Sequence, residues 1–126
     1  MFIIVVQFIS MHNFKELTVW QRAISLAINI YKLSQSFSTK DQFILSSQLS
    51  RCAFSIPSNI AEGAGKGSNK DFCRYISIAE GSSFELETQL IIIKEIISNK
   101  IATVDVLLKD LIIIQKMLYR LRTSLK

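Results

Sequence analysis

Residues 103–125 read TVDVLLKDLIIIQKMLYRLRTSL, and their apolar side chains recur at steps of four and three. This spacing places a continuous apolar seam on one side of a helix, as in coiled coils. The seam consists of Leu107, Leu111, Ile114, Leu118, Leu121 and Leu125. Ile112, Ile113 and Met117 widen the apolar surface beyond what a single neighbouring helix covers. We therefore predict a helix over about 103–124 with more than one packing partner.

Three earlier segments, over about 18–35, 41–64 and 69–99, have the same helical period and are separated by polar or glycine-rich turn signals. The first has two adjacent apolar stripes: Leu17, Trp20, Ile24, Ala27 and Tyr31 in one, and Ala23, Leu26, Ile30 and Leu33 in the other. Four helices of this length joined by short turns predict an all-α, antiparallel up-down-up-down four-helix bundle over residues 11–126.

Two features of the middle helices stand out. Pro57 lies inside the second helix, where proline removes a backbone hydrogen bond, so we expect a kink or a break between Cys52 and Pro57. In the third helix a mixed strip runs beside the main apolar stripe and contains Ile78, Glu85, Gln89, Ile92 and Ile96. A carboxylate on such a strip needs a cation. We expect Glu85 to pair with a cation such as Arg51 or Arg74 across a helix or a subunit interface, and Glu62, Glu80 and Glu87 to be solvated.

The first ten residues, MFIIVVQFIS, are an N-terminal extension that is too short to cross a membrane and lacks the features of a signal peptide. We interpret Met11 as the natural start, the alternative being an extra strand or helical turn that packs on a neighbour. We expect a cytoplasmic protein without membrane association. The two cysteines, Cys52 and Cys73, have apolar or aromatic neighbours, and we expect free thiols.

Composition bears on the partners of the chain. The net charge is +5 with a pI near 9.4, which favours polyanions as encounter partners. Hydrophobic residues make up 49% of the chain and the mean hydropathy is +0.32, both high for a small bundle. Apolar surface in excess of one core indicates self-association.

Catalytic and metal-binding patterns are absent from the sequence. The only histidine, His12, has no partner at a ligand spacing, and Cys52 and Cys73 have no second pair. No base is available for a serine or cysteine nucleophile. The run Gly63–Ser68 (GAGKGS) departs from a Walker A motif at both ends and follows a helix, so we interpret it as a helix end and turn. We expect no enzyme activity, no metal, no cofactor and no small-molecule substrate.

Three stretches carry a family resemblance: FKELTVWQRA (14–23), SQLSRCAFSIPSNIAEG (47–63) and FCRYISIAEGSSFELETQL (72–90). Over about 14–125 the chain resembles the bacterial 23S ribosomal RNA intervening-sequence protein family. The resemblance implies a four-helix bundle that forms a ring-like homopentamer, similar to the accessory protein of diversity-generating retroelements, whose basic pentamer binds nucleic acid. The motif positions it implies as structural or interface residues are Arg51, Ser55, Pro57, Asn59, Glu62, Gly63, Gly81, Ser82, Glu85 and Gln89.

Within these motifs we expect Gly81 to permit close helix approach and Asn59 to bridge helices. The chain departs from the usual family pattern in two places. Cys52 stands where a small alanine is common, and Glu80 stands where a basic residue often precedes Gly-Ser, which weakens any phosphate contact by that turn.

Two functions follow as hypotheses. The first is a non-catalytic oligomer that binds nucleic acid, RNA before DNA, through basic residues at the second turn and near the C-terminus. These are Lys66, Lys70, Arg74, Lys116, Arg120, Arg122 and Lys126. No aromatic residue is obviously interleaved with them, so base stacking is not predicted. Lys66, Lys70 and Arg74 also lie beside the free backbone N–H groups that begin the third helix, which suit a phosphate.

The second hypothesis is a protein-protein adaptor or scaffold that uses the excess apolar surface of the first and fourth helices. An enzyme ranks third. Only a buried polar pocket around Glu85, Gln89 and Asn59 would favour it.

Overall fold

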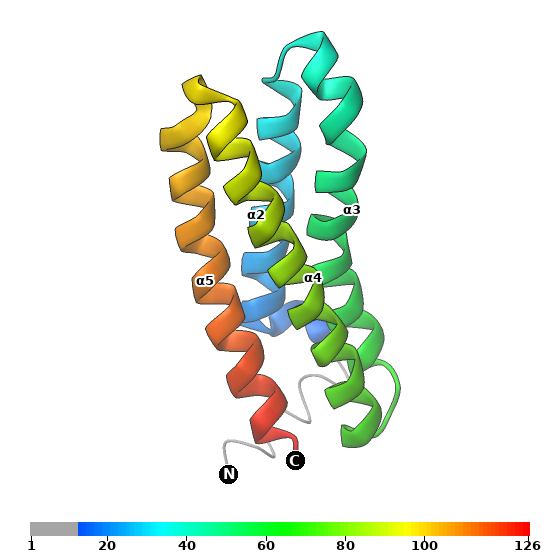
Figure 1. Ribbon diagram of the computed structural model, residues 1–126. Coiled ribbons are helices and arrows are strands. Elements are labelled where there is room, and N and C mark those ends of the chain that lie inside the picture. The colour runs from blue at the N-terminus through cyan, green and yellow to red at the C-terminus, as the bar shows by residue number, and fades with distance from the viewer. Residues whose placement is uncertain (1–12) are drawn as a thin grey trace.

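The computed structural model describes residues 13–126. Four long helices dominate them, α2 (Thr18–Gln35), α3 (Thr39–Ala64), α4 (Asn69–Ile96) and α5 (Ile101–Ser124), and successive helices run in opposite directions (Figure 1). Two short 3-10 helices, η1 (Phe14–Glu16) and η2 (Ser98–Lys100), precede α2 and α5. The predicted all-α four-helix bundle is confirmed. The interpretation of residues 1–10 and of the start at Met11 lies outside the described residues.

Side-chain caps explain two of the helix starts. The hydroxyl of Ser38 accepts a hydrogen bond from the backbone N–H of Asp41, and that of Ser68 accepts one from the N–H of Asp71. Each cap satisfies one of the donors that a helix start leaves unpaired. The cap at Ser38 starts α3 at Thr39, two residues before the predicted position. The helix α4 ends at Ile96, three residues before the predicted end at 99, which falls within η2.

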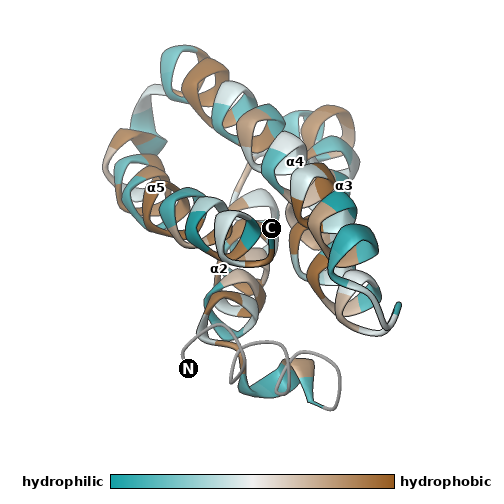
Figure 2. Cartoon of the chain, turned by 90° about the horizontal axis from the view of Figure 1, so that it is seen from below, coloured by the Kyte–Doolittle hydropathy of each residue, from teal (hydrophilic) through white to brown (hydrophobic). Residues whose placement is uncertain are grey.

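The four helices surround one core, with α2 diagonally opposite α4 and α3 opposite α5 (Figure 2). Each helix packs on its sequence neighbours, and α5 closes the bundle against α2. The whole α5 seam that the sequence predicts is buried in this core, where Leu111 and Leu118 have no exposed surface. The α4 residues Leu86 and Leu90 are equally inaccessible. Burial of such side chains contributes about 1.5–3 kcal/mol each, which makes the core the main source of stability.

A single chain leaves part of the predicted apolar stripes exposed to solvent. In α2 the stripe of Ala23, Leu26, Ile30 and Leu33 is buried, but Tyr31 of the other predicted stripe is 49% exposed. On α4 the mixed strip is also open to solvent, with Ile78, Ile92 and Ile96 all exposed. The bundle therefore leaves apolar flanks uncovered on more than one helix.

Of the two alternatives predicted at Pro57, the break is wrong, because α3 continues without interruption from Thr39 to Ala64. The kink stays a prediction. Pro57 is buried and lies against Ala27 and Tyr31 of α2 in a shallow groove between the two helices. The side-chain amide of Asn59 also donates a hydrogen bond of 2.8 Å to the carbonyl oxygen of Ser55 in the same turn. The helix thus tolerates the loss of one backbone hydrogen bond at a buried position.

The close approach between helices occurs at Gly63 and not, as predicted, at Gly81. A Cβ atom placed on Gly63 would lie 2.6 Å from Cβ of Tyr75 and 3.0 Å from Cδ1 of Phe72, so α3 and α4 meet at this point only because Gly63 has no side chain. A Cβ on Gly81 would meet no atom within 4 Å. Gly81 is exposed in the single chain and makes no room for a neighbouring helix there.

Candidate nucleic-acid interface

All seven basic residues predicted as nucleic-acid contacts lie at one end of the bundle. The turn between α3 and α4 carries Lys66 and is followed by Lys70 and Arg74. The second half of α5 carries Lys116, Arg120 and Arg122, and Lys126 follows the helix. Because α3 descends, α4 ascends and α5 descends again, this turn and the C-terminus lie at the same end (Figure 1). The structure therefore combines two groups that are some 40 residues or more apart in the sequence.

The net charge of the chain is concentrated at this end. Cutting each helix at its midpoint assigns residues 13–26, 52–82 and 113–126 to this end, which we call the basic half. It holds nine of the fifteen Lys and Arg residues and four of the ten acidic residues, a net charge of +5. The opposite half holds six of each and is neutral. An anionic polymer is therefore attracted to one end of the bundle.

Ion pairs divide the seven candidates into two groups. Lys66 lies 3.9 Å from Glu62, Arg74 lies 3.9 Å from Asp71, and Arg122 forms a two-pronged contact with Glu80. The remaining four have no ion pair with any described residue; they are Lys70, Lys116, Arg120 and Lys126. These four present charge that is free to meet phosphate.

The pair between Glu80 and Arg122 is the least exposed ion pair among the described residues, with side chains 13% and 22% accessible. The hydrogen bond that Arg122 donates to Glu80 raises the pKa of Arg122 above its ordinary value, so the guanidinium remains charged. The prediction that Glu80 is solvated is therefore wrong. Arg122 is committed to this carboxylate, which makes it the weakest of the seven candidates for binding phosphate.

Aromatic rings accompany the basic residues, contrary to the sequence-based prediction. Tyr75 has the amine of Lys66 at 5.4 Å and the guanidinium of Arg74 at 4.7 Å from its ring centroid. Tyr119 is 56% exposed and lies next to Arg120 in the chain, which was the signal available in the sequence. Basic residues and exposed rings thus share one surface, an arrangement that suits nucleic-acid bases as well as phosphates.

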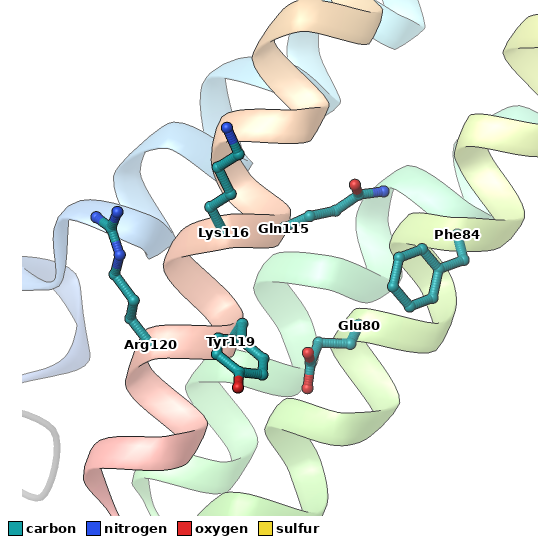
Figure 3. Close-up of a pocket in the computed structure, with 6 residues that line it drawn as sticks. All are labelled: Glu80, Phe84, Gln115, Lys116, Tyr119 and Arg120. Atoms are coloured by element: carbon teal, nitrogen blue, oxygen red, sulfur yellow. The ribbon is translucent and has the colours of Figure 1, made fainter.

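A groove of about 410 Å³ between α4 and α5 gathers several of these groups. Its walls are formed by Glu80 and Phe84 of α4 and by Gln115, Lys116, Tyr119 and Arg120 of α5 (Figure 3). Sequence reasoning did not identify Phe84 or Gln115 as site residues. Phe84 becomes a neighbour of Lys116 and Arg120 only when the two helices pack, whereas Gln115 directly precedes Lys116 on α5, which was the signal available in the sequence.

The start of α4 is a weaker phosphate site than the sequence indicated. The Ser68 hydroxyl already accepts one of the backbone N–H groups there, and the Asp71 carboxylate lies in the first turn. A negative side chain at a helix start competes with a bound anion for the same dipole. The interface is therefore better described by its free lysines and arginines than by this helix end.

Six motif positions lie along the contact between α3 and α4, which we call the motif face; they are Arg51, Ser55, Asn59, Ser82, Glu85 and Gln89. Ser55 and Ser82 share a hydrogen bond of 2.8 Å, and the amide of Asn59 donates to the Ser55 hydroxyl at 2.9 Å. Because Ser55 belongs to α3 and Ser82 to α4, these bonds join the helices, and Asn59 contributes to the bridge through Ser55. The motif serines therefore have a structural role within one chain.

A small hollow of about 210 Å³ opens on the motif face and is lined by Arg51, Cys52, Glu85 and Gln89, with Ser47 and Gln48. Arg51 and Glu85 are both exposed, and neither forms an ion pair with a described residue, so the predicted pairing of Glu85 is wrong for the single chain. The amide nitrogen of Gln89 lies 3.4 Å from the sulfur of Cys52, and its buried oxygen has no hydrogen-bond partner among the described residues.

This hollow differs from the buried polar pocket that the sequence analysis named as favouring an enzyme. Glu85 is exposed, and Asn59 is not part of the lining, so the polar pocket that would favour an enzyme does not form. Burial, together with the neighbouring Glu85, raises the pKa of the Cys52 thiol to about 11, which keeps it protonated and unreactive. Across residues 13–126, no three His, Cys, Asp or Glu side chains are grouped so that they could hold a metal ion. His12 lies outside the described residues.

None of the helices over residues 13–126 has the length and apolar character needed to cross a lipid bilayer. A search of curated protein sequences finds no significant match to the chain. The family model described as 23S rRNA-intervening sequence protein matches residues 15–120, which include most of η1 and all but the last turn of the bundle. The chain therefore belongs to the 23S rRNA-intervening sequence protein family.

Proposed function

We propose that this protein is a non-catalytic, self-associating nucleic-acid-binding protein that contacts the phosphate backbone through its basic half. The observation that carries the proposal is the confinement of the whole net charge of +5 to one half of the bundle. Phosphate contacts by Lys and Arg release counterions and make binding strongly dependent on salt. RNA ranks before DNA, in line with what the family resemblance implies.

Free cations are the strongest part of this surface. Lys116 and Arg120 lie one helical turn apart on α5 and have no ion pair with a described residue, and Lys70 and Lys126 extend the positive surface toward the α3–α4 turn and the C-terminus. Repetition of this surface in an oligomer multiplies the contacts made with one polymer. Affinity then rises without any new kind of contact in each chain.

Self-association is proposed to use the motif face. An exposed cation and anion, Arg51 and Glu85, lie there, and among residues 13–126 neither has an ion-pair partner and the buried oxygen of Gln89 has no donor. The neighbouring α4 strip exposes Ile78 and Ile92. A second copy would cover the isoleucines and supply the missing polar partners, which a buried polar group requires. The family resemblance implies a homopentamer as the resulting assembly.

The binding proposal is tested by titrating labelled RNA and DNA of equal length against the protein over a range of salt concentrations. Tight binding at low salt with a steep negative slope is expected. The variant Lys116→Gln/Arg120→Gln should reduce the slope by about 0.7 for each lost single-strand phosphate contact. The matched control, Lys32→Gln/Lys109→Gln, removes the same charge from the neutral half and should leave the slope unchanged.

The proposal fails if no nucleic acid binds at low salt, or if binding has no salt dependence. Equal weakening by both double variants would show that net charge acts without a defined surface. Self-association is measured separately by sedimentation velocity, where Ile92→Glu should dissociate the oligomer and Val106→Glu, an exposed position on α5, should not. A self-associating protein that binds no nucleic acid would instead support the adaptor or scaffold function.

A further inference from the structure

The α4–α5 groove holds two exposed aromatic rings that face the same space. Phe84 extends from α4 and Tyr119 from α5, and their side chains lie on opposite walls (Figure 3). They are 55% and 56% exposed, respectively. The core does not require either ring, since the helices are joined beneath them by buried leucines and isoleucines such as Leu86 and Leu118. Exposed rings on two facing helices indicate that the groove receives an apolar, flat group.

The charges around the groove favour an anion attached to that group. Lys116 and Arg120 lie on its α5 wall and have no ion pair with a described residue. The only carboxylate in the lining, Glu80, is neutralised by Arg122, whose guanidinium also lies 5.3 Å from the centroid of the Tyr119 ring. The ion pair therefore removes the negative charge that would repel a phosphate and packs against the aromatic side chain.

A base in a duplex is stacked on its neighbours and hides both faces, whereas an unpaired base exposes them to aromatic side chains. We propose that the α4–α5 groove binds an unpaired segment of single-stranded nucleic acid, with one or more bases stacked on Tyr119 and Phe84 and the adjoining phosphates held by Lys116 and Arg120. This inference rests on the proposed function and assigns a substrate class to one part of the basic half. It makes the protein selective for unpaired regions.

The test compares three oligonucleotide probes that contain the same number of phosphates: a single strand, a fully paired hairpin, and a single strand in which the central bases are replaced by abasic sites. The intact single strand should bind about fivefold or more tightly than the abasic strand, the low end of what stacking on one aromatic ring contributes. A 2-aminopurine base at the centre of the strand should be quenched on binding, which reports the stacking directly.

Variants locate the effect. Tyr119→Leu should abolish the preference for the intact strand, Tyr119→Phe should retain it, and Phe84→Leu should reduce it. Tyr31→Leu is the matched control, because Tyr31 is a comparably exposed tyrosine in the groove between α2 and α3, on the other side of the bundle from the α4–α5 groove. The circular dichroism spectrum and melting temperature of each variant establish that it is folded, as the exposed positions lead us to expect.

The possible failures are distinguishable. Equal affinity for the intact and abasic strands, with the steep salt dependence preserved, would overturn this inference and leave the proposed function standing. Preference for the hairpin would overturn it in the same way. Dissociation of the oligomer by Tyr119→Leu would show that another copy of the chain covers the groove, which also overturns it. If no probe binds at low salt, the proposed function and this inference fail together.

Discussion

Replacing two glycines with alanine should have opposite effects on stability, although both glycines lie inside helices and in the family motifs. Alanine is favoured over glycine in a helix interior by about 1 kcal/mol. At Gly81 nothing opposes this gain, because a new Cβ meets no atom within 4 Å. We expect Gly81→Ala to raise the free energy of unfolding by about 1 kcal/mol, which for a domain of this size corresponds to a melting temperature about 4 °C higher.

At Gly63 the same methyl group would collide with α4. Carbon atoms pack at about 3.5–4.0 Å, whereas the new Cβ would lie 2.6 Å from the Cβ of Tyr75. A rotamer change cannot move that atom, because the Cβ is attached directly to the α4 backbone, so the helices themselves must separate. Overpacking of this kind costs about 1–3 kcal/mol. A collision with an atom next to the backbone belongs at the upper end, and after the helix-propensity gain we expect a net loss of about 2 kcal/mol.

The assay is urea unfolding followed by far-UV circular dichroism, with melting temperatures as a second measurement. Gly63→Ala should melt about 7 °C below the wild type, and the two variants should differ by about 3 kcal/mol. Each variant is measured at two protein concentrations, so that any contribution from self-association is recognised by its concentration dependence. A Gly63→Ala protein as stable as the wild type would refute the reasoning. So would a loss of stability in Gly81→Ala that is the same at both concentrations.

Three further predictions concern side chains that the fold buries or joins. The pKa of the Cys52 thiol is raised from 9.0 to about 11 in the folded state, so the stability that the protonated thiol contributes is complete below pH 9 and is lost as the pH rises to 11. Cys52→Ala should therefore lose less stability than the wild type between pH 9 and pH 11. An equal loss in both proteins would contradict the raised pKa. Arg122→Leu leaves the half-buried Glu80 without its cation and should lower the free energy of unfolding by about 1–3 kcal/mol. Adding Glu80→Gln should recover part of the lost stability. A further loss in the double variant would argue against the Glu80–Arg122 ion pair. Ser55→Ala and Ser82→Ala should each cost about 1 kcal/mol in urea unfolding, with the double variant costing less than the sum because both partners are gone; strict additivity would show that their hydrogen bond does not form.

Helix content and helix ends were predictable from local sequence. The α5 seam identified its buried side without error, because a step of four and three residues allows only one face. Helix ends agreed with the structure within three residues, and the Ser38 cap accounts for the early start of α3. At Pro57 only the alternative of a break was wrong, because α3 continues through the proline, which is buried beside α2. A local signal for a break therefore need not end a helix.

The partners of polar residues were not predictable. Periodicity placed Glu85 on a mixed strip beside the main apolar stripe of α4, but it carries no information about which side of α4 meets α5. The sequence analysis therefore assigned the ion pair to Glu85, whereas the structure pairs Glu80 with Arg122, which lies 42 positions away. The α4–α5 groove was not predictable for the same reason, since Phe84 and Tyr119 become neighbours only when the two helices pack. Gly63 and Gly81 were misjudged for the same reason.

The sequence by itself determined that this chain forms four antiparallel helices around one core, because each helix needs only its own apolar period and its own end signals. The tertiary structure alone decided where the charge lies. Alternating helix directions bring residues 13–26, 52–82 and 113–126 to one end, and the net charge of +5 comes with them. The distance between two residues along the chain does not say whether they lie at the same end of a bundle. The modest net charge therefore becomes concentrated at one end only when the helices pack.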